Sequence, residues 1–245
     1  MQKCLDPMDF IALLIASICH DIDHPGRTNN FLCNVNDELA ILYNDSAVLE
    51  NHHAAHAFKI SVKNKSVNIF QNLDPETFKC LRKSIISMIL ATDMTQHFDH
   101  YNKFVAVIKP TFTETGLPEE NTLVFPLSQD HKSLVLRMAI KCADISNPSR
   151  KVALSQEWAH RIVVEYRSQI KEEQTRKLPR SLPPFDDIPK SQVMFIQLFA
   201  SDLLTAFNEF LDFPILTDTL TNTFEYWESW NEQNPYTFIP GEPIL

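Results

Sequence analysis

Residues 6–21 read DPMDFIALLIASICHD and carry a complete helix signature. Asp6 is placed to cap the helix, and Pro7 fits the first helical position because no amide donor is needed there. Asp9 lies in the first turn, where the helix dipole favours a negative charge. The apolar run 10–19 is too short to span a bilayer and is followed by polar residues, so it predicts a buried core helix.

Similar helix start and stop signals recur along the chain, and they predict an all-α fold of several compactly packed helices. Only three glycines occur in 245 residues, far fewer than the turns of a β-rich or doubly wound protein would use. Most of the 15 prolines fall between apolar periodic stretches, where they end helices. We predict one domain over residues 1–245, with a helical core at about 5–231 and a tail at 232–245. Further helices are predicted over residues 37–43, from 45 or 46 onward, 75–91, 98–109, 131–144, 154–174, 191–211 and 217–230, with connections at 111–127 and 177–189.

Charge and cysteine usage narrow the class of protein. The net charge of −9 argues against a nucleic-acid partner, which would need a basic face. If the substrate is a phosphate ester, bound cations must supply the positive charge that the side chains lack. The five cysteines form no CxxC pair and are odd in number, so neither a disulfide framework nor a cysteine zinc site is predicted. With no signal peptide and no membrane span, we expect a cytoplasmic protein.

Three apolar helices are predicted to end in an aspartate, namely Asp21, Asp93 and Asp144. Each carboxylate would face the negative end of its helix dipole, which is unfavourable by roughly 0.3–1 kcal/mol. Burial without a partner would cost more. A lone His-Asp pair such as His20-Asp21 would be read as a core histidine at a helix end, but three such ends together indicate a shared cation.

The donor types fit a centre of two metal ions. The imidazole of His20 suits zinc, whereas carboxylate and water suit magnesium or manganese. Asp21 has two carboxylate oxygens and could bridge two ions. In the helix after residue 46, His52 and His56 are spaced as a zinc pair on one face, whereas Glu50 and His53 lie on another. These four side chains cannot all point to one site, and spacing alone leaves the choice open.

Residues 20–26, HDIDHPG, resemble the HDxxHPG signature of class I cyclic nucleotide phosphodiesterases. Four further blocks follow in the order and at about the spacing of that family, and the resemblance covers residues 5–231. The run HPGRTNNFLCN followed by ELAILYND is most similar to the type-eight branch, which is selective for cyclic AMP. The four blocks are LAILYNDSAVLENHH at 39–53, ILATDMTQHF at 89–98, IKCADISNP at 140–148 and IPKSQVMFI at 188–196.

The resemblance implies roles for individual residues. His20, Asp21 and Asp144 match ligands of a tightly bound zinc-like ion, and Asp21 also matches the bridge to a second ion, Mg²⁺ or Mn²⁺. Four positions match residues that hold the waters of that second ion, namely Glu50, His53, Thr92 and Asp93. Asp23 and His24 would support the centre rather than bind an ion. His52 would be a supporting residue at most, and His56 would be structural or on the surface. Glu50 would also orient the general acid.

The substrate residues implied by the resemblance lie near the C-terminal end of the chain. Gln192 matches the glutamine that hydrogen-bonds the purine edge, since its amide has one acceptor and two donors. Phe195 and Ile162 match an apolar clamp around the base, and Asn147 matches a position that contacts adenine. Without the resemblance, Phe195 would be read as a core residue.

One expected block is missing from the 245 residues. The family carries Tyr-His-Asn-x-x-x-His about forty residues before HDxxHPG, and its two histidines serve as general acid and as fourth zinc ligand. No histidine precedes His20 here. We therefore expect an N-terminally truncated domain, from a shortened gene model or a short isoform, that binds zinc weakly and is by itself inactive or nearly so. Loss of the general acid alone would slow hydrolysis roughly 10²–10⁴-fold.

The predicted function is metal-dependent hydrolysis of a 3′,5′-cyclic nucleotide, cyclic AMP, to the 5′-monophosphate. Two alternatives are kept. A broader His-Asp phosphohydrolase would have no need of the Gln192–Phe195 segment. A catalytically impaired nucleotide-binding or scaffold protein would explain the missing block but not the intact ligands. A homodimer is left open.

Overall fold

Side-chain caps fix the start of α1 (Pro7–Cys19) as its sequence predicts. The Asp6 carboxylate accepts hydrogen bonds from the backbone amides of Met8 and Asp9, and the Asp9 carboxylate accepts one from the Asp6 amide. This reciprocal arrangement is a capping box. The Lys132 ammonium lies 2.9 Å from Asp6 Oδ2 and 3.2 Å from Asp9 Oδ2, so it binds both capping carboxylates.

The computed structural model describes residues 5–63, 65–113, 127–182 and 187–233, and these ranges contain helices and no strand. The predicted all-α fold is confirmed. No helix in these ranges combines the length and the apolar character needed to cross a membrane. After α1 come α2 (Asn29–Asn34), α3 (Glu38–Leu42), α4 (Val48–Lys63), α5 (Pro75–Leu90), η1 (Met94–Gln96), α6 (His97–Thr113), α7 (Gln129–Asp144), η2 (Asn147–Ser149), α8 (Val152–Arg176), α9 (Ile188–Phe195), the π-helical turn η3 (Ile196–Ala200), α10 (Ser201–Leu211) and α11 (Ile215–Gln233).

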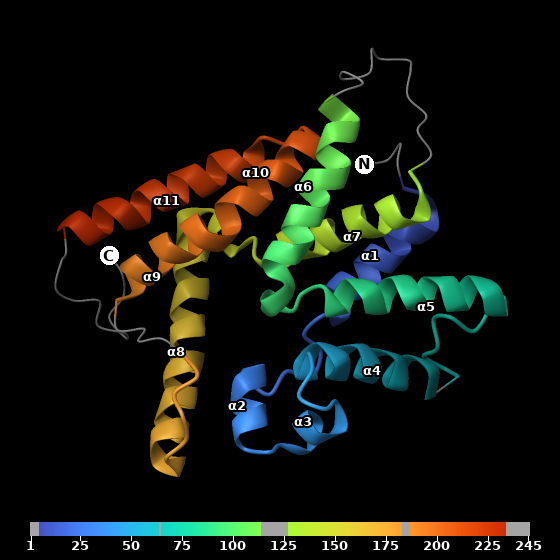
Figure 1. Cartoon of the computed structure of the whole chain (residues 1–245), viewed down its shortest axis with the longest axis horizontal. Helices are drawn as coiled ribbons and strands as arrows, with labels where there is room; N and C mark the ends of the chain where they lie inside the picture. The colour runs from blue at the N-terminus through green and yellow to red at the C-terminus, as the bar shows by residue number, and fades with distance from the viewer. Residues whose placement is uncertain (1–4, 64, 114–126, 183–186, 234–245) are drawn as a thin grey trace. The chain divides into compact units, whose positions relative to one another are not determined.

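Two compact units make up the chain, and the first comprises the residues up to Pro25 together with Glu38–Asp144. In this unit α1 packs against α5 and α7, while α4 lies along α5 and α6 packs on α7 (Figure 1). Small residues of α1 let the helices approach closely, and aliphatic side chains of α5 and α7 fill the core. These residues are Ala12, Ala16, Ile85, Met88, Ile89, Val135 and Leu136.

One face of α1 carries large apolar side chains that the described residues leave exposed. Ile11, Leu14 and Ile18 are 43%, 64% and 80% exposed. Their spacing of three and four places them on a single stripe of the helix. This stripe lies apart from Ala12 and Ala16, which face the core.

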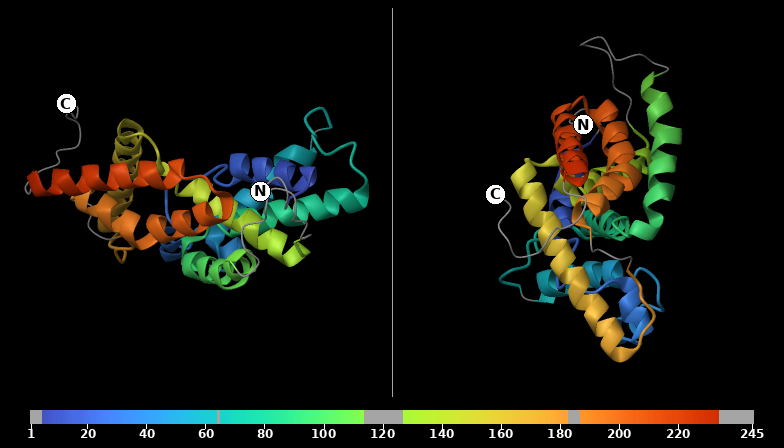
Figure 2. Two further views of the ribbon diagram at one scale, coloured as in Figure 1. Left: turned by 90° about the horizontal axis from the view of Figure 1, so that it is seen from above. Right: turned by 90° about the vertical axis from the view of Figure 1, so that its left-hand side faces the viewer.

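The second unit comprises Gly26–Asp37 and the chain from Ile145 onward. Here α11 packs against α9, η2 and α10, and α10 and α11 run side by side (Figure 2). Hydrogen bonds fasten residues 26–37 to α8. Both Nε and Nη2 of Arg27 donate to Glu172 Oε2, at 3.0 and 2.7 Å. The Gln169 amide pairs with Thr28 in both directions, accepting from its backbone amide at 2.8 Å and donating to its hydroxyl at 3.0 Å.

The structure differs from the sequence prediction in a few elements. Helix α2, which Thr28 caps, was not predicted. The single helix predicted over 191–211 is an α–π–α succession that starts earlier, at Ile188, because Asp187 caps it. The predicted connection at 177–189 therefore ends at Asp187, with residues 183–186 outside the described ranges. Residues 114–126 and 234–245, which hold most of the other predicted connection and of the tail, also lie outside them.

Candidate metal centre

His20, Asp21 and Asp144 converge in the first unit at the ends of two helices. His20 is the C-cap of α1, Asp21 follows it, and Asp144 is the last residue of α7. Because α1 packs against α7, the two helix ends bring the three side chains together. His20 Nε2 lies 3.3 Å from Asp144 Oδ1 and 3.4 Å from Asp21 Oδ2. One ligand atom from each residue lies within 4.8 Å of the others.

These spacings fit a zinc-like ion. Ligand bonds of 2.0–2.1 Å in tetrahedral geometry separate two ligand atoms by about 3.3 Å. Both distances from His20 Nε2 match that value. His20 Nδ1 lies 2.9 Å from the Ser17 carbonyl and donates to it, so Nε2 offers its lone pair to an ion. One imidazole and two carboxylates therefore lie at separations at which they could hold one ion.

Without a metal ion, the cluster of His20, Asp21 and Asp144 favours a positive charge on His20. The pKa of His20 is raised to about 9, chiefly by its hydrogen bond to Asp144 and further by the charges of Asp21 and Asp144. Burial opposes this shift because it disfavours the charged ring. A proton on His20 thus takes the place that an ion would occupy.

His53 supports the turn that carries Asp21. Its side chain is buried, and its Nδ1 donates to the Ile22 carbonyl at 2.7 Å. Its Nε2 lies 3.9 Å from Asp21 Oδ1, the oxygen that does not face His20. Burial lowers the pKa of His53, which favours a neutral ring. The ring of His24 stacks on that of His53 at a centroid distance of 5.6 Å.

The end of α5 supplies two buried polar residues to the same unit. The Thr92 hydroxyl donates to the Ile89 carbonyl at 2.8 Å, and Asp93 Oδ1 accepts from the Thr95 amide at 2.8 Å. These bonds fix the turn between α5 and η1. Glu50 lies in the first turn of α4 and is half-buried. Their predicted role in holding metal-bound waters stays a prediction.

Lys141 is an element of the site that the sequence reasoning missed. Its side chain is only 1% exposed, and its ammonium donates to the Ala91 carbonyl at 3.1 Å. Burial lowers the pKa of Lys141, while the charges of Asp144, Asp93 and Glu50 oppose that shift in this order of size. A cation is therefore buried among the carboxylates of the predicted site. Its position within the apolar stretch 138–143, three residues before Asp144, was the available signal.

The four predicted base-binding residues lie in the second unit. Gln192 and Phe195 are half-buried on α9, Ile162 lies on α8, which packs against α9, and Asn147 begins η2. The centroid of the Phe195 ring lies 5.8 Å from that of the Phe199 ring. The π-helical turn η3 follows Phe195 directly, and such turns occur frequently at functional sites.

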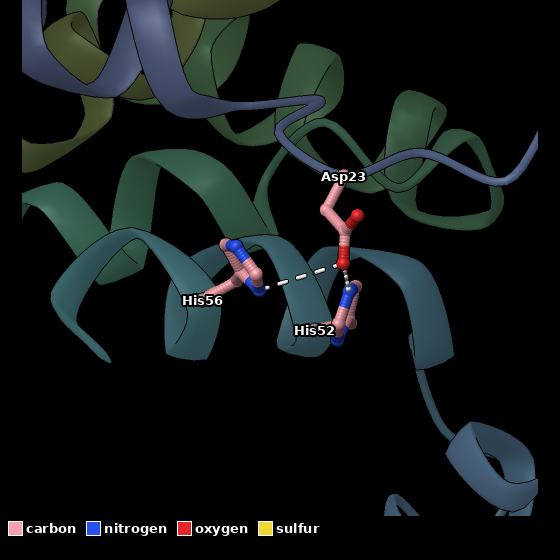
Figure 3. A group of neighbouring side chains, drawn as sticks. All are labelled: Asp23, His52 and His56. Carbon is pink, nitrogen blue, oxygen red and sulfur yellow. Dashed lines mark hydrogen bonds and ion pairs between the residues drawn. The ribbon is translucent and has the colours of Figure 1, made fainter. Parts of the chain in front are cut away.

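His52 and His56 of α4 form a second group with Asp23 (Figure 3). His52 and His56 both approach Asp23 Oδ2, at 2.9 and 3.4 Å. His53 faces the Asp21 turn, whereas His52 lies 2.9 Å from Asp23 (Figure 3).

Comparison with known proteins places the chain in a family. Residues 1–223 match the family model of 3′5′-cyclic nucleotide phosphodiesterases. The chain is 48% identical over 242 residues to the high affinity cAMP-specific and IBMX-insensitive 3′,5′-cyclic phosphodiesterase 8A of Homo sapiens, covering 95% of this chain and 29% of that protein. It is 44% identical over 237 residues to the phosphodiesterase 8 of Drosophila melanogaster described in the same words, covering 95% and 25%. The chain thus spans well under half the length of these curated relatives.

A solved structure shares the fold. The phosphodiesterase domain of Salpingoeca rosetta rhodopsin phosphodiesterase superposes with a TM-score of 0.85 at 31% identity, covering 95% of this chain and 69% of that one. The expected similarity to the type-eight branch is confirmed by the curated relatives. By its sequence and its all-helical fold, the chain belongs to the class I 3′,5′-cyclic nucleotide phosphodiesterase family.

Proposed function

We propose that this chain contributes the metal centre and the base-binding segment of an enzyme that hydrolyses 3′,5′-cyclic AMP to 5′-AMP. The observation that carries the proposal is the convergence of His20, Asp21 and Asp144 at zinc-like spacing. The substrate is proposed from the names of the curated relatives, which are cAMP-specific phosphodiesterases.

We propose Zn²⁺ at His20, Asp21 and Asp144, and Mg²⁺ or Mn²⁺ at a second position beside Asp21. The mixed donor set supports zinc at the first position, and a carboxylate with waters suits the harder ion. Bound ions would polarise the phosphoryl oxygens and offset the charge that develops on them. A protein with a net charge of −9 has particular need of such cations for an anionic substrate.

The chain's own residues would hold this centre in position. Ser17 fixes the tautomer of His20, and His53 holds the backbone of the Asp21 turn through Ile22. The charge of Lys141 interacts favourably with the carboxylates of Asp144 and Asp93 and so partly offsets their negative charge. Because these side chains are already held in position, ordering them costs little free energy when an ion binds.

Recognition of the base is proposed for Gln192, Phe195, Ile162 and Asn147. The Gln192 amide can donate to and accept from a purine edge, while the apolar side chains offer a stacking surface. An amide that pairs with the base discriminates between substrates because a wrong base leaves the amide unpaired. A general His-Asp phosphohydrolase would not need these residues, so Gln192→Ala should change cyclic AMP affinity.

A cytoplasmic location is also proposed. Cys19, Cys33, Cys80 and Cys142 are all free thiols, and a reducing compartment keeps thiols in that state.

Conversion of radiolabelled cyclic AMP to 5′-AMP by the purified chain, with Zn²⁺ and Mg²⁺ present, tests the proposal. Product should form slowly and only with metal, and Asp144→Ala should abolish it because a zinc ligand is lost. Equal product from both proteins, or product in the presence of a chelator, would contradict the proposal. Metal-dependent cyclic AMP binding without product would favour the nucleotide-binding alternative, and the absence of both product and binding would reject the assignment.

A further inference from the structure

Asp23, His52 and His56 form a cluster that the proposed catalytic centre does not use. Asp23 lies in the turn after α1, and the two histidines lie one helical turn apart on α4 (Figure 3). We propose that these three residues form a second, independent metal site that binds Zn²⁺ and fastens this turn to α4.

The distances fit a zinc ion with little rearrangement. His56 Nδ1 lies 3.4 Å from Asp23 Oδ2, which matches the separation of about 3.3 Å between two ligands of tetrahedral zinc. His52 Nε2 lies 2.9 Å from the same oxygen in a hydrogen bond. An ion would replace that bond and lengthen the contact by about 0.4 Å. All three ligand atoms already lie within 4.8 Å of one another.

The donor chemistry selects zinc over the hard cations. Two imidazoles and one carboxylate suit zinc, whereas magnesium and calcium prefer oxygen ligands alone. A neutral His52 ring offers the Nε2 lone pair when its proton resides on Nδ1. Three protein ligands leave a fourth position for water, and the Asp23 side chain, 57% exposed, gives an ion access from solvent.

The backbone holds the cluster in place before any ion binds. Asp23 has a positive φ of 62°, a conformation that aspartate adopts more readily than most residues. The preceding residue is fixed, because His53 donates to the Ile22 carbonyl at 2.7 Å. Spacing of four on one helix also places His52 and His56 on the same face. Little conformational entropy is therefore left to lose on binding.

A purely structural reading explains only part of this cluster. One hydrogen bond, from His52 to Asp23, is enough to fasten the turn to α4. His56 adds a second imidazole directed at the same carboxylate oxygen. The two imidazoles and the carboxylate thus each place a ligand atom within reach of one shared ion.

The decisive comparison is made in a His20→Ala background, which removes the proposed catalytic zinc ligand. Zinc content is measured on the 245-residue chain after equilibrium dialysis against Zn²⁺, by mass spectrometry of the metal. His20→Ala should retain about one equivalent of zinc that the double variant with His56→Ala lacks. Equal zinc content in the two proteins overturns the proposal, whatever the state of the catalytic centre.

Two further measurements keep the test independent of any folding defect in that background. In otherwise unchanged protein, His56→Ala should lose about one equivalent of zinc, and His160→Ala, a half-buried helical histidine outside both clusters, should lose none. Zinc should also raise the melting temperature of the unchanged protein more than that of His56→Ala. Equal zinc loss in both variants would indicate adventitious histidine binding and overturn the assignment, as would equal thermal shifts.

Discussion

Replacing Asp144 by asparagine should lower the pKa of His20. Asp144 is the largest cause of the raised value, through its hydrogen bond at 3.3 Å and through its charge. The difference between the ordinary 6.5 and about 9 corresponds to roughly 3 kcal/mol of preference for the protonated ring. Asparagine keeps the shape but removes the charge, and only Asp21 and the Ser17 carbonyl then oppose burial. We expect the His20 pKa to fall by at least about one pH unit, or roughly 1.4 kcal/mol.

The sign of the stability change follows from the raised pKa. Protonated His20 stabilises the metal-free fold fully below about pH 6.5, and that stabilisation is lost as the pH rises through about 9. The free energy of unfolding of the wild-type chain should therefore decrease between these two values. Asp144→Asn should flatten this decrease, because less stabilisation remains to be lost.

The assay is an NMR titration of the His20 ring in chelator-treated protein, joined with urea unfolding at about pH 6 and about pH 9. Asp130→Asn, at the opposite end of α7, is the matched control and should leave the His20 titration unchanged. Superimposable titration curves of His20 in wild type and Asp144→Asn would refute the electrostatic account of the cluster.

Three further changes test other parts of the account. Lys141→Met leaves the neighbouring carboxylates without their buried cation and should lower the free energy of unfolding by about 2–4 kcal/mol. The control Lys103→Met, on an exposed surface, should lower it by less than about 0.5 kcal/mol. Similar urea midpoints for the two variants would contradict the role assigned to Lys141. Asp6→Ala removes the cap of α1 and should cost about 1 kcal/mol, seen as a lower melting temperature. Ile18→Lys replaces a side chain that is 80% exposed, so it should leave the melting temperature unchanged within about 1 °C, whereas a clear decrease would contradict that exposure.

Local signals account for the parts of the fold that the sequence predicted well. The caps at Asp6 and Asp74 set helix starts through side chains within three residues, so no tertiary information is needed to find them. Helix α2 was not predicted because its sequence, NNFLCN, contains three asparagines, which are weak helix formers. The π-helical turn after Phe195 was not predicted because it changes the backbone hydrogen bonding and leaves the apolar pattern of the sequence intact.

The candidate site likewise has residues that the sequence could predict and residues that it could not. Aspartates at helix ends are visible in sequence, and they led to Asp21 and Asp144. The meeting of Asp23 with His56 depends on a turn of positive φ and on how that turn lies on α4, which spacing does not encode. Lys141 was overlooked because lysine is rarely buried, and only packing places it among carboxylates.

Anomalous diffraction at the zinc edge, from crystals of the chain grown with Zn²⁺, tests the central claim most directly. We expect a peak within about 2.0–2.2 Å of His20 Nε2, Asp21 Oδ2 and Asp144 Oδ1. In crystals of Asp144→Ala this peak should weaken strongly or vanish. Zinc found only at other positions, with these three side chains still paired to one another, would contradict it.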